Sequence, residues 1–259
     1  MPRSKRSFAN SSAIALFAIP GLPEIRKGQN LPGLILHATR RSGGALENGD
    51  VIVIAQKIVS KAEGRIARLS KTKPSPRAAE LAGKLANDSR FLEVVLRESR
   101  RILRSERVLI AETRHGFICA NAGVDRSNVP GRDVVTLLPK NPDRTARRIA
   151  AAIRKRVGKR VAVIISDTFG RPWRLGLANV AIGAAGVPVL LDLRGTRDRN
   201  RKRLHATVLA VADELAAAAG LLMGKAEGTP VVVVRGYRYK PALEPAARII
   251  RPANEDLFR

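Results

Sequence analysis

The sequence VAVIISDTFGR, residues 161–171, decides the fold, because a run of β-branched residues leads directly into polar residues. Such a run is typical of a strand buried on both faces. We expect the strand to deliver Asp167 and Thr168 at its C-terminal end, before a turn that carries Gly170. A carboxylate and a hydroxyl in this position are a common support for a divalent cation that contacts phosphates. The alternative is that Asp167 only caps the turn.

A second acidic loop lies upstream in HGFICANAGVDRSNV, residues 115–129. A strand-like run that begins at Phe117 leads to Asp125 and the polar residues after it. Hard cations prefer carboxylate and carbonyl oxygens, so Asp125 and Asp167, at the ends of different strands, are suited to share a metal. The pair of carboxylates favours phosphate chemistry more strongly than either carboxylate does alone.

A third segment, ENGDVIVIAQKIVSKAEGR at residues 47–65, contains a turn at 48–50 and a strand at 51–55. The strand is followed by two lysines, Lys57 and Lys61, which are suited to meet a polyphosphate. Because a charge run is usually a solvated face, we interpret Lys57 as solvated and choose Lys61 as the phosphate-binding candidate.

Helices and further strands alternate irregularly along the rest of the chain. Apolar spacing, Pro, Gly and charge positions predict helices that begin at Arg77, cover 91–106, run from Asp143 to Gly158, and cover 204–224. Further strands are expected at 13–19 and 230–236. Because the elements lack the regular βαβ rhythm of a doubly wound sheet, the predicted fold class is α+β.

The charge of the chain raises a rival function. The 48 Lys and Arg residues against 22 Asp and Glu residues give a net charge of +26. A field of this sign attracts nucleic acids, so a basic nucleic-acid-binding protein is the main alternative class. The basic residues are spread over clusters at 1–6, 97–107, 144–160 and 194–203, and aromatic residues are only 3% of the chain. Base-stacking platforms are therefore scarce, and we expect any nucleic-acid binding to be non-specific.

Other site chemistries lack their sequence signals. The segment GLLMGKA, residues 220–226, is not a Walker loop, and no G-x-G-x-x-G follows a strand. Cys119 is the only cysteine, which excludes zinc clusters and disulfide frameworks and indicates a role in core packing. His37, His115 and His205 are scattered, so none is identified as a general base.

Six motifs in order resemble one known family, that of the coenzyme F420-0:L-glutamate ligases. They are GLPEI at 21–25, VSKAEGR at 59–65, NAGVDRSN at 121–128, SDTFGR at 166–171, ADELA at 212–216 and PVVVVRG at 230–236. The resemblance implies a GTP-dependent and metal-dependent ligase that adds L-glutamate to the deazaflavin phosphodiester F420-0 through γ-glutamyl amide bonds. It also implies two intertwined subdomains with mixed sheets and packed helices, one inserted in the other, within residues 13–259 after a basic arm at 1–12, and a homodimer.

The resemblance also implies the site residues. Metal binding falls on Asp125, Asp167, Thr168 and Glu227, and catalysis on Lys61, Asp125 and Asp167. The implied GTP contacts are Leu22, Pro23, Glu24, Ile25, Gln56, Lys61, Asn128, Met223, Gly224, Lys225, Ala226, Glu227, Gly228 and Thr229. The expected ions are Mg²⁺ or Mn²⁺, two per site, with K⁺ as a further candidate.

The chemistry of such a ligase follows from the substrates. A carboxylate does not condense with an amine in water, so the acceptor carboxyl must first become an acyl phosphate. Metal ions and a lysine would neutralise the charge that builds on the phosphoryl oxygens. The alternative is a metal-dependent phosphohydrolase, which would use Asp125 and Asp167 to direct water at phosphorus.

Two segments depart from the family pattern. Some members carry a metal-binding carboxylate near the place of Lys225, and Glu227 is the candidate to replace it here. The segment 198–201 lacks the glycine of an Asp-x-x-Gly-Arg pattern, which bears on the acceptor substrate.

The N-terminus imitates a short signal peptide, because Arg3, Lys5 and Arg6 precede the apolar run at 13–19. The run lacks a small-residue cleavage site and leads into the GLPEI motif, so we interpret it as the first strand. The apolar stretch at 206–223 is interrupted by two acidic residues and is not expected to span a membrane. The predicted location is cytoplasmic.

Overall fold

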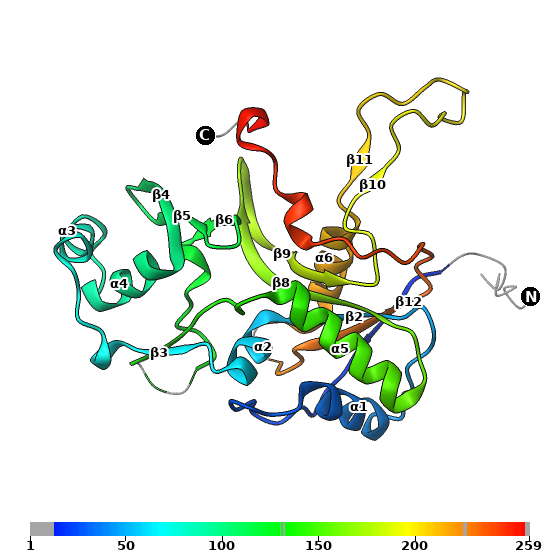
Figure 1. Ribbon diagram of the computed structural model, residues 1–259, viewed down its shortest axis with the longest axis horizontal. Helices are drawn as coiled ribbons and strands as arrows, with labels where there is room; N and C mark the ends of the chain where they lie inside the picture. The colour runs from blue at the N-terminus through cyan, green and yellow to red at the C-terminus, as the bar shows by residue number, and fades with distance from the viewer. Residues whose placement is uncertain (1–12, 130, 132, 225–226, 257–259) are drawn as a thin grey trace, which may run out of the picture.

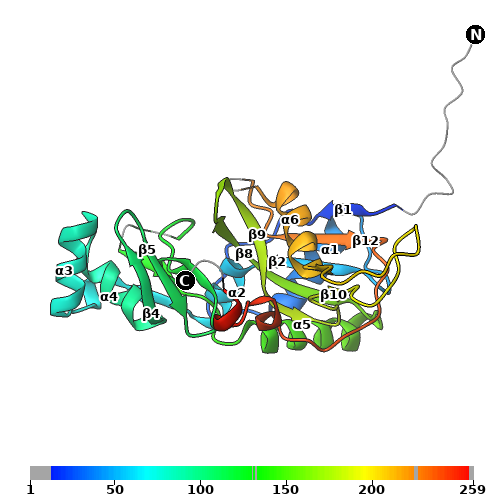
Figure 2. The same cartoon turned by 90° about the horizontal axis from the view of Figure 1, so that it is seen from above.

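The computed structural model describes residues 13–129, 131, 133–224 and 227–256. It consists of a large lobe around a five-stranded sheet and a small lobe, residues 66–137, which projects from one side (Figures 1 and 2). Helices and mixed sheets are both present, so the α+β class is confirmed. The predicted basic arm at 1–12 lies outside the described residues. Within the described ranges, no helix is both long and apolar enough to cross a membrane.

The central sheet of the large lobe has the strand order β1-β12-β2-β8-β9. The strands are β1 (Ala15–Ala18), β12 (Val231–Arg235), β2 (Val51–Ala55), β8 (Ala162–Arg171) and β9 (Arg174–Ala185). β2 and β8 pair in parallel, whereas the other neighbouring strands are antiparallel. Mixed pairing of this kind accounts for the irregular order of elements in the sequence.

Alternate residues of β2 face two separate apolar layers. Val51 and Val53 pack in the cluster that contains α6 (Val211–Met223), and Ile52 and Ile54 pack in the cluster that contains α1 (Leu31–Arg41) and α5 (Pro142–Val157). All four side chains are completely buried. A strand covered on both faces reads as a continuous apolar run, which is why the sequence signal is strong.

Helix α5 begins one residue before the predicted start. Its N-cap is Asn141, whose side chain accepts a hydrogen bond from Arg144 N. Asp143 lies in the first turn instead, and its Oδ1 accepts bonds from Ala184 N at 2.8 Å and Ala246 N at 3.0 Å. The carboxylate therefore ties β9 and the C-terminal segment to the helix. The predicted end is confirmed, because Gly158 caps the helix with a φ of 71°.

The prediction of a helix over 204–224 is wrong at its start, since α6 covers only Val211–Met223. The preceding residues return along a projecting ribbon whose base pairs β10 (Leu191–Asp192) with β11 (Val208–Leu209) (Figure 1). In this ribbon Leu204 N donates to Thr196 O, and Leu193 N donates to Thr207 O. Backbone groups of Leu204 and Thr207 therefore form hydrogen bonds across the ribbon, which a helix would break.

The small lobe has a core of its own and contains a second wrong prediction. Its elements are β3 (Ile66–Arg68), α3 (Pro76–Leu85), α4 (Ser89–Glu98), β4 (Ser99–Ser105), β5 (Leu109–Thr113), β6 (Ile118–Ala120) and β7 (Val134–Thr136). The helix expected over 91–106 ends at Glu98, because the chain turns extended at Ser99 and pairs with β5. Arg101 and Glu112 form an ion pair of 2.7 Å across these strands.

The remaining elements are short. They are α2 (Gln56–Glu63), η1 (Leu69–Lys71), η2 (Asn121–Gly123), η3 (Ala246–Ile249) and η4 (Ala253–Glu255). Arg65 joins the lobes, since it donates to Leu138 O at 2.9 Å and pairs with Glu98 at 2.5 Å.

The turn expected at Gly170, after Asp167 and Thr168, is absent, because Gly170 lies within β8, which continues to Arg171 before the chain returns as β9. The pairing shifts in register between Ile165 and Ser166. Such a bulge re-aims the side chains that follow it. Asp167 and Thr168 therefore lie where a buried strand emerges into the pocket described below, inside a hairpin.

Candidate functional site

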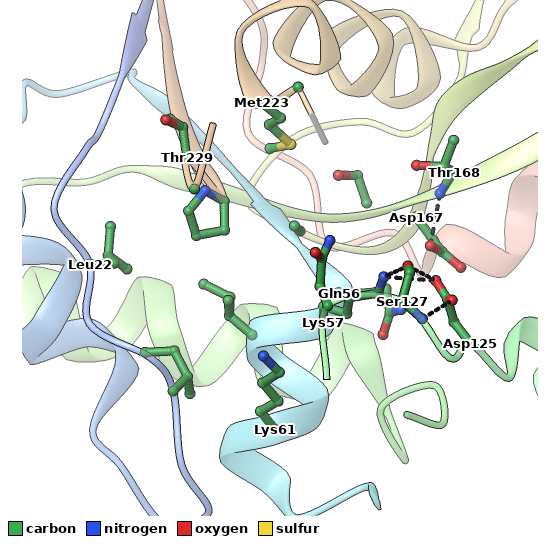
Figure 3. A pocket seen from close by; sticks show the side chains of 18 of the residues that line it. Leu22, Gln56, Lys57, Lys61, Asp125, Ser127, Asp167, Thr168, Met223 and Thr229 are labelled. Carbon is green, nitrogen blue, oxygen red and sulfur yellow. Dashed lines mark hydrogen bonds and ion pairs between the residues drawn. The ribbon is translucent and has the colours of Figure 1, made fainter. Parts of the chain in front are cut away.

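A pocket of about 880 Å³ opens where α2 and β8 meet the segments that follow β1, η2 and α6 (Figure 3). Most of the predicted site residues line it, although they come from five distant parts of the chain. They are Leu22, Pro23, Glu24, Ile25, Gln56, Lys61, Asp125, Asn128, Asp167, Thr168, Met223, Gly224, Gly228 and Thr229. The structure thus brings the two predicted strand-end carboxylates into one cavity.

Asp125 is held by the loop that follows η2. Its backbone forms a bridge with Thr136, in which Asp125 N donates to Thr136 O at 3.0 Å and Thr136 N donates back at 2.8 Å. Ser127 N donates to Asp125 Oδ1 at 2.7 Å, and Ser127 Oγ donates to Asp125 Oδ2 at 3.0 Å. The carboxylate is therefore fixed in the small lobe and faces the large lobe across the pocket.

Lys57 is the cation next to Asp125. Its Nζ lies 2.7 Å from Asp125 Oδ2 and also donates to Ser127 Oγ. Burial alone would raise the pKa of Asp125, but the bonds from Lys57 and Ser127 outweigh burial and hold that pKa below its ordinary value. Asp125 is thus ionised in this site and is paired with Lys57. The Lys57 side chain is 18% exposed, so the interpretation of Lys57 as a solvated residue is wrong.

Asp167 and Thr168 are oriented by bonds within the β8–β9 hairpin. Thr168 N donates to Asp167 Oδ1 at 2.8 Å, and Thr168 Oγ1 donates to Asn179 Oδ1 at 3.0 Å. Because the Thr168 hydroxyl donates its proton to Asn179, its oxygen can act as an acceptor or a metal ligand through its lone pairs. In Figure 3 the carboxylates of Asp125 and Asp167 lie on the same side of the view, with Thr168 above them.

Lys61 lies one turn after Lys57 on α2 and has a different partner. Its Nζ is 2.5 Å from Glu24 Oε1, and the Lys61 side chain is 8% exposed against 64% for Glu24. Gln56, at the start of α2, is buried and accepts from Ser60 Oγ at 2.8 Å. The helix therefore presents two lysines to the pocket, each paired with a carboxylate from a different segment.

Three predicted site residues are not placed in the pocket. Lys225 and Ala226 lie outside the described residues. Glu227 is described but does not line the pocket. Its carboxylate folds back against Gly224, where an added Cβ would lie 1.6 Å from Glu227 Oε2. The structure therefore does not bring Glu227 to Asp125 and Asp167.

Sequence reasoning missed three further polar lining residues, Ser127, Ser166 and Asn179. Ser166 Oγ is buried and has no hydrogen-bond partner among the described residues. Asn179 Nδ2 donates to the Met223 sulfur at 3.6 Å. The Asn179 position was not accessible from sequence, because it depends on the register of β9 against β8. Ser127 carried a signal, since an Asp-x-Ser segment is typical of a side-chain-capped turn.

The donor set fits a hard divalent cation held partly by substrate. The described residues contain no group of three or more His, Cys, Asp or Glu side chains placed to hold a metal. Asp125, Asp167 and the Thr168 hydroxyl supply oxygen ligands, which Mg²⁺ and Mn²⁺ prefer. Mg²⁺ is usually bound by one or two carboxylates together with phosphates and waters.

Residues expected outside the site are also found outside it. His37, His115 and His205 do not line the pocket. Cys119 is buried in the small lobe, as its predicted packing role requires. Burial raises the pKa of the Cys119 thiol to about 12, and the charge of Asp167 adds to this shift. Neither residue type therefore supplies a base or a nucleophile to this pocket.

Comparison with known proteins identifies the family of the chain. A family model described as F420-0:Gamma-glutamyl ligase matches residues 21–236. A coenzyme F420:L-glutamate ligase of Methanothermobacter thermautotrophicus is 44% identical over 253 residues, which covers 95% of this chain and 99% of the relative. One of Methanopyrus kandleri is 47% identical over 249 residues, covering 93% and 96%. One of Methanocaldococcus jannaschii is 44% identical over 216 residues, covering 83% and 86%. The chain therefore belongs to the F420-0:gamma-glutamyl ligase family.

Proposed function

We propose that this protein is a coenzyme F420:L-glutamate ligase that joins L-glutamate to F420-0 in coenzyme F420 biosynthesis, with GTP as the phosphoryl donor. Family membership over most of the chain supports the reaction class. The observation that carries the mechanism is that Asp125 and Asp167 line one pocket together with Lys57 and Lys61. Two carboxylates beside two lysines are suited to a nucleotide that arrives with divalent cations.

The reaction balances as two displacements. An oxygen of the acceptor carboxylate attacks the γ-phosphorus of GTP, GDP leaves, and an acyl phosphate forms. The amine of L-glutamate then attacks the acyl carbon, inorganic phosphate leaves with the electron pair of the broken C–O bond, and the amine gives up a proton. The product is an amide. The carboxylate oxygen that a direct condensation would release as water leaves with the inorganic phosphate.

The residues of the pocket divide this work. Asp125, Asp167 and Thr168 would hold divalent cations, which would neutralise charge on the phosphoryl oxygens and align donor with acceptor. Lys61 would contact the phosphates as a point charge when it leaves Glu24. The segments that contain Leu22, Met223 and Thr229 surround the remaining space and would enclose the nucleoside.

The proposal has further parts that rest on family membership alone. They are two Mg²⁺ or Mn²⁺ ions per site, a role for K⁺, a homodimer, and a cytoplasmic location. The segment 198–201 lies on the projecting ribbon (Figure 1). Its effect on the choice of acceptor substrate stays a prediction.

Replacement of Asp167 tests the proposed roles. Asp167→Asn keeps the size of the side chain and an oxygen for Thr168 N, but removes the charge that would hold a cation. We expect glutamyl transfer to F420-0 to fall by roughly 100-fold or more, as is typical when a group that acts on a transition state is lost. The measurement is product formation by mass spectrometry, with far-UV circular dichroism to show that the variant is folded.

Glu80→Gln is the matched control, because Glu80 is an exposed carboxylate of α3 that pairs with Lys84. It should turn over at the wild-type rate. Turnover of Asp167→Asn at the wild-type rate would contradict the proposed metal site. Release of GDP without glutamylated product in the wild-type protein would favour the phosphohydrolase instead.

A further inference from the structure

The two lysines of α2 stand in unlike electrostatic positions, although they are one helical turn apart. Lys57 is paired with Asp125, which is a proposed metal ligand, whereas Lys61 is paired with Glu24, which is not. Both pairs lie in the same pocket. The two lysines should therefore affect the binding of a cation in the pocket differently.

Both oxygens of Asp125 already accept hydrogen bonds. Oδ1 accepts from Ser127 N at 2.7 Å, while Oδ2 accepts from Ser127 Oγ at 3.0 Å and contacts Lys57 Nζ at 2.7 Å. A divalent cation that coordinates a carboxylate oxygen at about 2.0–2.6 Å cannot share that oxygen with an ammonium at this distance without strong repulsion. Metal binding at Asp125 Oδ2 therefore requires that Lys57 moves away, and a cation on Oδ1 would still be repelled by the ammonium on the same carboxylate.

The charges of the described pocket lining indicate when this movement is favourable. The ionisable groups are the carboxylates of Glu24, Asp125 and Asp167 and the ammonium groups of Lys57 and Lys61. Three negative and two positive charges nearly balance, so a divalent cation that enters alone leaves an excess of positive charge. A polyphosphate that enters with the cation supplies anionic oxygens to which the displaced ammonium can bind.

We propose that Lys57 is an internal counter-ion of Asp125 that opposes divalent-cation binding until a phosphate-bearing ligand draws its ammonium away. The inference deepens the proposed function and rests on its metal site at Asp125. Lys57 is thus a positioning residue that makes metal binding depend on the nucleotide. It keeps the carboxylate oriented in the nucleotide-free protein and limits adventitious metal binding.

The test is Mn²⁺ binding to the full-length protein without nucleotide, measured from the electron paramagnetic resonance signal of free Mn²⁺. Lys57→Met removes the competing charge and should bind Mn²⁺ at least roughly tenfold more tightly than the wild type, as expected for the loss of a partly buried charge at contact distance. Lys57→Arg retains the charge and should behave as the wild type. Addition of GDP should tighten binding to the wild type more than to Lys57→Met.

Two further variants separate the possible failures. Lys61→Met is the matched control, because it also removes a lysine from α2 but leaves the Lys57–Asp125 pair; it should not increase Mn²⁺ affinity by the same factor. Asp125→Asn should lose the binding. If Lys57→Met binds Mn²⁺ as the wild type does while Asp125→Asn loses it, the counter-ion role is overturned and the metal site stands. If Asp125→Asn binds as the wild type does, the metal site itself is wrong.

Discussion

Individual residues decide the chemistry of the pocket through partners that are distant in sequence. Asp125 comes from the small lobe and Asp167 from the central sheet, and Lys57 is bonded to Ser127, 70 positions later. The residue types of this site were visible in the sequence, because each carboxylate follows an apolar run. Which lysine meets which carboxylate was not visible, because it depends on how the lobes are placed.

Cys119 provides a prediction at the residue scale. Its pKa of about 12, raised by burial and by Asp167, means that the native thiol is neither ionised nor accessible at neutral pH. We expect slow reaction with a thiol reagent between pH 7 and 9 in the native protein, and rapid reaction of one equivalent after unfolding. Because only the unfolded thiol ionises near the ordinary pKa of 9.0, Cys119 lowers stability above that pH and has no effect below it. Rapid native labelling would contradict the buried position.

Elements pack closely where α5 crosses the sheet. A Cβ added at Gly183 of β9 would lie 2.6 Å from the backbone carbon of Pro142, so the strand or the helix would have to shift. We expect Gly183→Ala to lower the free energy of unfolding by about 1–3 kcal/mol. Chemical denaturation measures the change.

Gly83→Ala is the corresponding control within a helix. Gly83 lies in α3, and an added Cβ would meet nothing within 4 Å. Alanine should therefore raise the free energy of unfolding by about 0.5–1 kcal/mol, because it restricts the unfolded chain and favours the helix. Equal effects at the two glycines would mean that the contact between α5 and β9 is not as described.

The elements also show what sequence patterns can predict. The β-branched runs of β2, β8 and β12 were predicted as strands, because burial on both faces leaves a continuous apolar signal. The prediction of a helix over 91–106 is wrong from Ser99 onward. The residues after Ser99 are compatible with a helical or a strand period, and their pairing with β5 makes them a strand. The start of α6 failed for a similar reason, because the ribbon bonds of 204–207 are long-range.

The whole molecule carries a charge of +26, which exceeds what one nucleotide site requires. We expect weak, sequence-independent binding to single-stranded RNA at low ionic strength, with log affinity falling against log salt by about 0.7 for each phosphate contacted. The Asp167→Asn variant should bind RNA as the wild type does, because the pocket is not involved. Filter binding at several salt concentrations measures this, and binding that resists salt or prefers one sequence would support a nucleic-acid function.

The placement of the two lobes brings the residues of the pocket together, so the proposed activity requires both lobes. The most direct measurement is mass spectrometry of F420-0 after incubation with the full-length protein, L-glutamate, GTP and Mn²⁺ or Mg²⁺, beside a reaction without GTP. The ligase account predicts mass increments of one or more glutamyl units that appear only with GTP, together with GDP. An unchanged F420-0 mass in the complete reaction would contradict it, whether GTP is left intact or hydrolysed.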